Sequence, residues 1–117
     1  LAEGVLTGKY SGGNIPTDSR AANEQSNIFI KNRLTADKLD KVDKLVPIAK
    51  ELGLSMAQLA LAWCLRKPEI SSVITGASKV EQVIANVKAS GITIPEDVLD
   101  TNEEILDNEP RDQYADY

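Results

Sequence analysis

The stretch Ser72-Val73-Ile74-Thr75-Gly76-Ala77-Ser78-Lys79-Val80-Glu81-Gln82 decides the fold, because in it a strand pattern runs directly into a helix pattern. The β-branched, apolar run over residues 70–75 predicts a short buried strand that ends at a Gly turn. A helix is then predicted to open on Ser78, with a capping box over residues 78–81. Unpaired N–H groups and the positive dipole end of a helix favour an anion, and Lys79 adds a full positive charge. We therefore expect this turn to bind an anion.

A longer helix is predicted upstream, over residues 36–52. Its apolar residues recur at three- and four-residue spacing, which is typical of a helix with one buried face. Thr35 can cap its start, and Gly53 can end it in a left-handed conformation. Pro47 falls inside this pattern and removes one backbone hydrogen bond, so we expect a kink there.

Three further helical segments are expected downstream of this one. Ser55 and Gln58 form a capping box for a helix that runs to Lys67, and apolar residues surround nearly its whole circumference. Such a helix is buried or packed on two sides. The helix after the Gly turn is predicted to end near Gly91, and Pro95 suits the first turn of a last helix.

The beginning of the chain has weaker patterns. Residues 1–10 are interpreted as the end of a strand followed by a Gly-containing turn, and residues 11–33 as a loop, with a short helix over residues 23–32 as the alternative. Strands separated by helices imply parallel pairing in an α/β protein. Two strands cannot form a stable parallel sheet alone, so we expect the missing strands to come from upstream of Leu1.

The composition and charge distribution of the chain exclude several classes of function. Residues 1–95 carry 12 Lys and Arg against 9 Asp and Glu, whereas residues 96–117 carry one Arg against 9 acidic residues. The bulk is thus mildly basic and lacks a basic face interleaved with aromatic residues, so we expect no nucleic-acid partner. No apolar run reaches the length of a membrane span, and the single cysteine, Cys64, excludes an internal disulfide. We expect a cytoplasmic protein without direct membrane insertion, and no metal site.

A second anion-binding candidate is Gly4-Val5-Leu6-Thr7-Gly8-Lys9-Tyr10. Its Gly8-Lys9 pair invites comparison with a P-loop. The spacing from Gly4 to Gly8 is one residue short, however, and Tyr10 stands where a P-loop needs Ser or Thr. We therefore interpret this segment as a Gly-containing loop with a cation, and not as a P-loop.

Taken together, these segments resemble the aldo-keto reductases, most closely the branch that contains voltage-gated potassium channel β subunits and their bacterial and plant relatives. The matching segments are Leu1-Ala2-Glu3-Gly4-Val5-Leu6-Thr7-Gly8-Lys9-Tyr10, Ile15-Pro16 with Ser19-Arg20, Gln58-Leu59-Ala60-Leu61-Ala62-Trp63-Cys64-Leu65, and Ser72-Val73-Ile74-Thr75-Gly76-Ala77-Ser78 with Gln82 and Asn86. The family fold is a (β/α)8 barrel, so the resemblance implies an α/β chain that forms the C-terminal part of such a barrel. Residues 1–108 would then run from the end of strand seven to the terminal helix, and residues 109–117 would form a polar acidic tail.

The resemblance also implies a bound NADPH. In the family pattern the opening segment runs along the pyrophosphate, Arg20 reaches it from the loop, the Gly turn holds the 2′-phosphate, and the following helix faces the adenine. On this chain the implied cofactor-binding residues are Leu1, Ala2, Gly4, Thr7, Lys9, Tyr10, Arg20, Gly76, Ser78, Lys79, Gln82 and Asn86. Lys79 stands where many relatives have arginine, which removes a bidentate contact to the phosphate.

The family's catalytic Asp, Tyr, Lys and His all lie upstream of the part resembled here, and the chain contains no His. We therefore assign no catalytic residue. Three hypotheses follow. In the first, the chain is the cofactor-binding portion of an NADPH-dependent reductase of aldehydes or ketones. In the second, it is a regulatory module that binds NADPH with little turnover, as a channel subunit or homo-oligomer. In the third, it is an inactive truncated chain.

Overall fold

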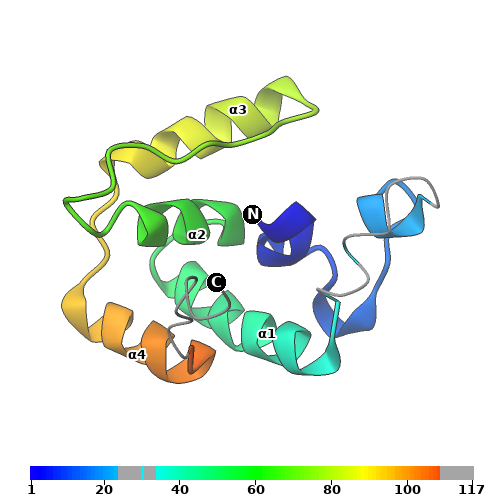
Figure 1. Ribbon diagram of the computed structural model, residues 1–117, viewed down its shortest axis with the longest axis horizontal. Coiled ribbons are helices and arrows are strands. Elements are labelled where there is room, and N and C mark those ends of the chain that lie inside the picture. Colours follow the sequence, from blue (N-terminus) through cyan, green and yellow to red (C-terminus); the bar gives the residue numbers. More distant parts are fainter. Residues whose placement is uncertain (24–29, 31–33, 109–117) are drawn as a thin grey trace, which may run out of the picture.

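The structure, a computed structural model, describes residues 1–23, 30 and 34–108 (Figure 1). The helices in chain order, with η for 3-10 helices, are η1 (Ala2–Thr7), η2 (Ser11–Gly13), η3 (Arg20–Ala22), α1 (Ala36–Glu51), α2 (Met56–Cys64), α3 (Val80–Val87), η4 (Lys88–Gly91) and α4 (Glu96–Leu106). The acidic tail predicted over residues 109–117 and most of the alternative helix over residues 23–32 lie outside the described residues.

The predicted helix over residues 36–52 is confirmed as α1. The Thr35 side chain accepts a hydrogen bond from Lys38 N at 3.4 Å, and Gly53 follows the helix with a left-handed φ of 68°. Pro47 lies inside α1, which continues past it to Glu51. The helix packs its apolar face inward, because Val42, Leu45 and Ala49 are all buried.

The second predicted helix is confirmed as α2, with both halves of its capping box. Ser55 Oγ accepts from Gln58 N, and Gln58 Oε1 accepts from Ser55 N, each at 3.1 Å. The predicted end at Lys67 is wrong, since the helix stops at Cys64. Beyond it, Arg66 stacks its guanidinium 3.5 Å from the centre of the Trp63 ring and donates to the Trp63 carbonyl at 2.9 Å. These contacts hold the turn before Pro68.

One core joins α1, α2 and the N-terminal segment. Its buried members come from the whole length of the chain and are Val5, Tyr10, Ile30, Val42, Leu45, Ala49, Met56, Leu59, Ala62 and Ile94. Burial of this apolar surface stabilises the arrangement by roughly 25 cal/mol per Å² removed from water. In Figure 1, α2 lies between α3 above and α1 below, and α4 lies beside α1.

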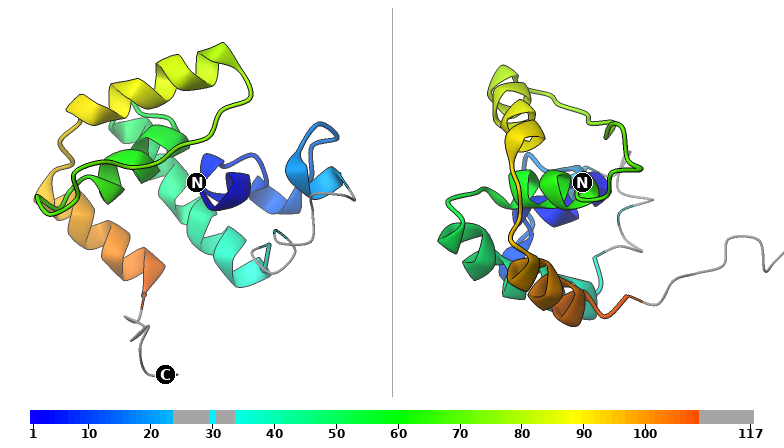
Figure 2. Two further views of the ribbon diagram at one scale, coloured as in Figure 1. Left: turned by 45° about the horizontal axis from the view of Figure 1, so that its top comes forward. Right: turned by 90° about the vertical axis from the view of Figure 1, so that its left-hand side faces the viewer.

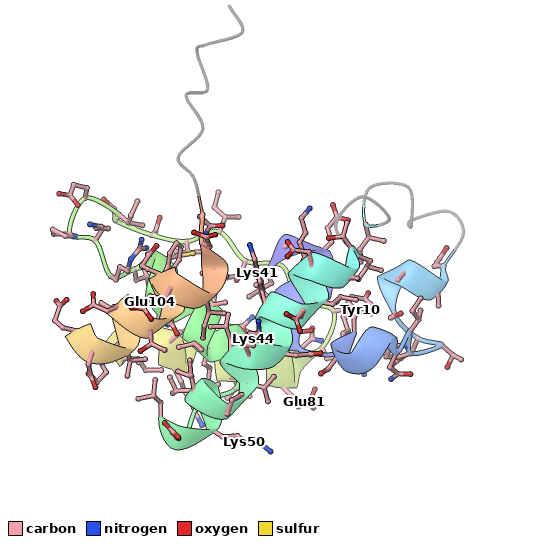
Figure 3. The ribbon with its side chains drawn as sticks, turned by 90° about the horizontal axis from the view of Figure 1, so that it is seen from below. Tyr10, Lys41, Lys44, Lys50, Glu81 and Glu104 are labelled. Carbon is pink, nitrogen blue, oxygen red and sulfur yellow. The ribbon has the colours of Figure 1, made fainter. Side chains whose placement is uncertain are left out.

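The last helix is held to α1 by side chains as well as by apolar packing. Its residues Val98, Leu99, Ile105 and Leu106 pack against the core. Lys41 of α1 donates from Nζ to the Leu106 carbonyl at 2.8 Å, which satisfies one of the carbonyls left free at the end of α4 (Figure 3).

The strand predicted over residues 70–75 is wrong. Residues 70–77 form no regular element, and the described ranges 1–23, 30 and 34–108 contain no strand. The predicted strand end in residues 1–10 is likewise replaced by η1 and a turn. A parallel strand exists only through hydrogen bonds to neighbouring strands, and the described part of the chain offers none. Consequently Ile74 is 97% exposed.

The apolar face of α3 is also uncovered. Val80, Val83, Ile84 and Val87 recur at three- and four-residue spacing and so lie on one face, but each remains at least half exposed. A cavity of about 260 Å³ lies between α2, α3 and residues 72–75. Helices in α/β proteins bury such a face against a sheet, so this surface has the composition of a sheet-facing helix without its sheet.

No single helix in the described part of the chain has the length and hydropathy needed to cross a membrane. The pair α1 and α2 passes that test only when taken together, and the two are bent by 93° at their junction.

Asp43 of α1 connects the N-terminal loop to the core. Its carboxylate accepts from the Ser11 hydroxyl and, at 3.3 Å, from Gly12 N. We expect Asp43→Ala to lower the free energy of unfolding by about 1 to 2 kcal/mol, because two hydrogen bonds to a charged acceptor are lost. Asp40→Ala, which removes only an exposed 3.0 Å pair with Lys44, should cost under about 0.5 kcal/mol in the same urea titration. Equal losses in the two variants would contradict this assignment.

Candidate functional site

A cavity of about 530 Å³ lies between the N-terminal segment and the turn that leads into α3. In both views of Figure 2 the extended segment before α3 passes close to the N-terminal segment. The residues that line the cavity are Leu1, Glu3, Gly4, Thr7, Lys9, Ala57, Ile74, Thr75, Gly76, Ala77, Ser78, Gln82 and Asn86. The two stretches that the sequence singled out as anion-binding candidates therefore border one space.

The N-terminal wall has an unusual backbone. Ala2, Glu3 and Gly4 have φ values of 49°, 58° and 101°, so three successive residues are left-handed. Only glycine adopts this region without strain, and the other two residues cost of order 1 kcal/mol or more each. The Thr7 hydroxyl donates to the Gly4 carbonyl at 2.6 Å and closes the turn. Strain of this kind in a cavity wall is typical of a binding loop.

Lys9 depends on Gly4 for its position. A Cβ built on Gly4 would collide with Lys9 Cε and lie 2.9 Å from Lys9 Nζ, so the lysine side chain lies directly over the glycine. The ammonium group is also 5.6 Å from the centre of the Tyr10 ring, within the range of a cation–π contact. The absence of a side chain at Gly4 thus lets a full positive charge lie at the edge of the cavity.

The opposite wall is the turn at the start of α3, and its capping differs from the prediction. Lys79, and not Ser78, is the N-cap residue, so the predicted box over residues 78–81 is wrong by one position. Gln82 fills the role expected of Glu81, because its Oε1 accepts from Ser78 N at 2.8 Å, from Lys79 N at 3.3 Å and from the Ser78 hydroxyl at 3.4 Å. The turn therefore has several convergent donors.

One side chain connects α2 to α3 by a hydrogen bond. Gln58 Nε2 donates to the Ala85 carbonyl at 2.9 Å, while its oxygen caps α2. One amide group therefore joins α3, whose first turn lines the cavity, to α2, which contributes Ala57 to the lining.

Eight of the predicted cofactor-binding residues line this cavity, namely Leu1, Gly4, Thr7, Lys9, Gly76, Ser78, Gln82 and Asn86. Ala2 and Lys79 adjoin lining residues without lining it themselves. Tyr10 is 1% exposed in the core, and its hydroxyl accepts from Ala21 N at 3.3 Å. Arg20 begins η3, and its side chain lies outside what the structure describes. Contact between any of these residues and a cofactor stays a prediction.

Sequence reasoning missed several lining residues, among them Glu3 and Ala57. Glu3 reaches the cavity because of its left-handed backbone, for which a glutamate carries no sequence signal. Ala57 lines it because α2 begins beside the N-terminal segment. Within the described residues, no three His, Cys, Asp or Glu side chains are grouped so that they could hold a metal ion.

A sequence model of the Aldo/keto reductase family matches residues 1–107. The chain is 49% identical over 113 residues to a probable voltage-gated potassium channel subunit beta of Oryza sativa subsp. japonica, which covers 95% of the chain and 34% of that protein. A protein of the same name from Arabidopsis thaliana is 47% identical over the same shares. An L-glyceraldehyde 3-phosphate reductase of Escherichia coli O157:H7 is 39% identical over 93% of the chain and 32% of that protein. The chain thus spans about a third of the length of these relatives.

Proposed function

The chain belongs to the aldo/keto reductase family, and on that premise we propose that it forms the NADPH-binding part of a reductase of aldehydes or ketones. The observation that carries this proposal is the single cavity bordered by both anion-binding candidates. The fold proposed for the chain is the C-terminal part of a (β/α)8 barrel. The uncovered apolar face of α3 and the exposed Ile74 support it, because both have the character of surfaces that pack within a barrel.

The donors around the cavity suit a nucleotide with two separate phosphate groups. The Lys9 ammonium on one wall fits a diphosphate, and the N–H and hydroxyl donors of Ser78 on the other fit a phosphate monoester. Gly4 allows the backbone and the lysine to approach a ligand closely. NADPH would supply a hydride to the carbonyl carbon. The residues of this chain would bind and orient the dinucleotide, and none of them is assigned a proton transfer.

Thermal unfolding with added nucleotide tests the proposal directly. NADPH at about one hundred times its dissociation constant should stabilise the chain by about 2.7 kcal/mol. NADH, which lacks the 2′-phosphate, should stabilise it less at the same concentration. If millimolar NADPH leaves the unfolding midpoint unchanged, the chain does not bind the cofactor and the proposal fails.

A second candidate function follows from the names of the plant relatives. The rice and Arabidopsis proteins are named as probable channel subunits, and the chain shares 49% and 47% of its residues with them over 113 residues. In this alternative, NADPH binds in the same cavity and the protein acts as a regulatory subunit or homo-oligomer in the cytoplasm. Co-purification with the cytoplasmic domain of a potassium channel would favour it. Rapid turnover of small aldehydes without a partner would favour the reductase.

A further inference from the structure

Three hydrogen-bond donors at the start of α3 converge on one oxygen atom. Ser78 N, Lys79 N and the Ser78 hydroxyl all lie within 3.4 Å of Gln82 Oε1. These are the donors that a phosphate at this turn would need, since the first N–H groups of a helix have no partner within the helix. Gln82 itself lines the 530 Å³ cavity and is exposed, so a ligand can reach and displace its side chain.

We propose that Gln82 is a specificity-determining residue, whose amide oxygen occupies the phosphate donors until a 2′-phosphate displaces it. This inference rests on the proposed function and adds to it a competitor within the site. A nucleotide without the 2′-phosphate leaves the Gln82 contacts intact. A nucleotide with the 2′-phosphate replaces three bonds to a neutral oxygen by bonds to a charged one.

The exchange favours the phosphate for electrostatic reasons. Hydrogen bonds to an ionised acceptor are roughly twice as strong as those between neutral groups. The positive end of the α3 dipole and the adjacent Lys79 strengthen this preference. The freed Gln82 amide carries both a donor and an acceptor, and it lies on the same side of α3 as Asn86, which also lines the cavity. Because Gln82 is exposed, its displacement leaves no buried polar group without a partner.

The proposal predicts an effect on affinity of opposite sign to that of a simple ligand contact when Gln82 is removed. If Gln82 only contacted the adenine, its loss would weaken all adenine nucleotides equally. If Gln82 competes for the phosphate donors, its loss must strengthen binding of nucleotides that carry the 2′-phosphate relative to nucleotides that lack it. The dissociation constant for AMP divided by that for adenosine 2′,5′-bisphosphate isolates this effect, because the two probes differ only in the 2′-phosphate. A higher ratio means a stronger preference for the 2′-phosphate.

The experiment measures this ratio by isothermal titration on the 117-residue chain. Gln82→Met keeps the side-chain length and removes the acceptor, and it should raise the ratio about threefold to tenfold, which corresponds to one net hydrogen bond. Gln82→Glu places a charged acceptor on the same donors and should lower the ratio by about tenfold or more. The glutamate variant keeps the cap of α3, so the test does not depend on how well the methionine variant folds.

Asn86→Ala is the matched control, because Asn86 lines the same cavity from the same helix. The donors at Ser78 and Lys79 bond to Gln82 and not to Asn86. This variant should weaken both probes alike and leave the ratio unchanged. A ratio that falls or stays constant in Gln82→Met, or that does not fall in Gln82→Glu, overturns the proposal while the proposed function stands. Failure of the wild-type chain to bind adenosine 2′,5′-bisphosphate overturns the proposed function itself, and this inference with it.

Discussion

The paired substitution Ser78→Asp with Lys79→Glu should lower the affinity for NADPH by at least about 100-fold, since each lost bond to an ionised phosphate contributes about 1.5 to 3 kcal/mol. The two acidic side chains would repel the 2′-phosphate from the donors that Gln82 now engages. The folded chain should be no less stable than the wild type, because acidic residues are favourable at a helix N-terminus. Thermal unfolding with and without NADPH measures both quantities in one series.

The matched control makes the same two kinds of substitution, serine to aspartate and lysine to glutamate, at the other end of the same helical segment. Lys88→Glu with Ser90→Asp changes the formal charge equally, and both residues are exposed in η4. This variant should lose some stability, since negative charge near a helix C-terminus is unfavourable, but it should keep most of the stabilisation by NADPH. If both variants lost that stabilisation equally, the effect would reflect overall charge and the 2′-phosphate would not bind at Ser78.

The elements that sequence reasoning predicted correctly are those set by contacts within one or two helical turns. The Thr35 cap bonds to Lys38, and the Ser55 and Gln58 pair bond to each other, so each signal lies within four residues. The cap of α3 was missed by one position because Glu81 and Gln82 both lie at capping distance from a candidate N-cap. The register was decided by the donors that the Gln82 oxygen can reach together.

The strand over residues 70–75 could not be settled from its own sequence. Its β-branched pattern is typical of a strand that is paired on both edges and covered on both faces. The neighbours that would pair with it and cover it are not among the described residues. Only the resemblance to a barrel family, which assigns both stretches to one NADPH, indicated that they lie together, because nothing in local periodicity brings Lys9 and Ser78 to one space. Local propensity therefore accounts for the helices, and long-range topology for the site.

The substitution Gly4→Ala should weaken binding of a diphosphate about tenfold and lower the free energy of unfolding by about 1 to 3 kcal/mol, through separate causes. The loss of stability comes from the backbone, since φ at Gly4 is 101° and alanine is strained there. The loss of binding comes from Lys9, whose Cε and Nζ atoms must leave the space that the new methyl group occupies. Titration with ADP and urea unfolding measure the two effects separately.

Gly13→Ala separates strain from displacement. Gly13 has a φ of 77° and no atom within 4 Å of the added Cβ, so the substitution strains the backbone without moving a side chain. It should cost about 1 kcal/mol of stability and leave ADP binding unchanged. A fall in ADP affinity as large as that in Gly4→Ala would show that loop strain alone controls binding.

A double-mutant cycle assigns the binding effect to Lys9. Lys9→Ala alone should weaken ADP binding about tenfold, because a charge-assisted contact to phosphate is lost. In the Lys9→Ala background, Gly4→Ala should then have no further effect on ADP affinity, although it should still lower stability through its backbone. Additive losses of affinity would mean that Gly4 acts on the ligand through its own close approach to the phosphate. In that case the cavity would bind the diphosphate with the η1 backbone, and the overlap of Gly4 with the lysine would have no role in recognition.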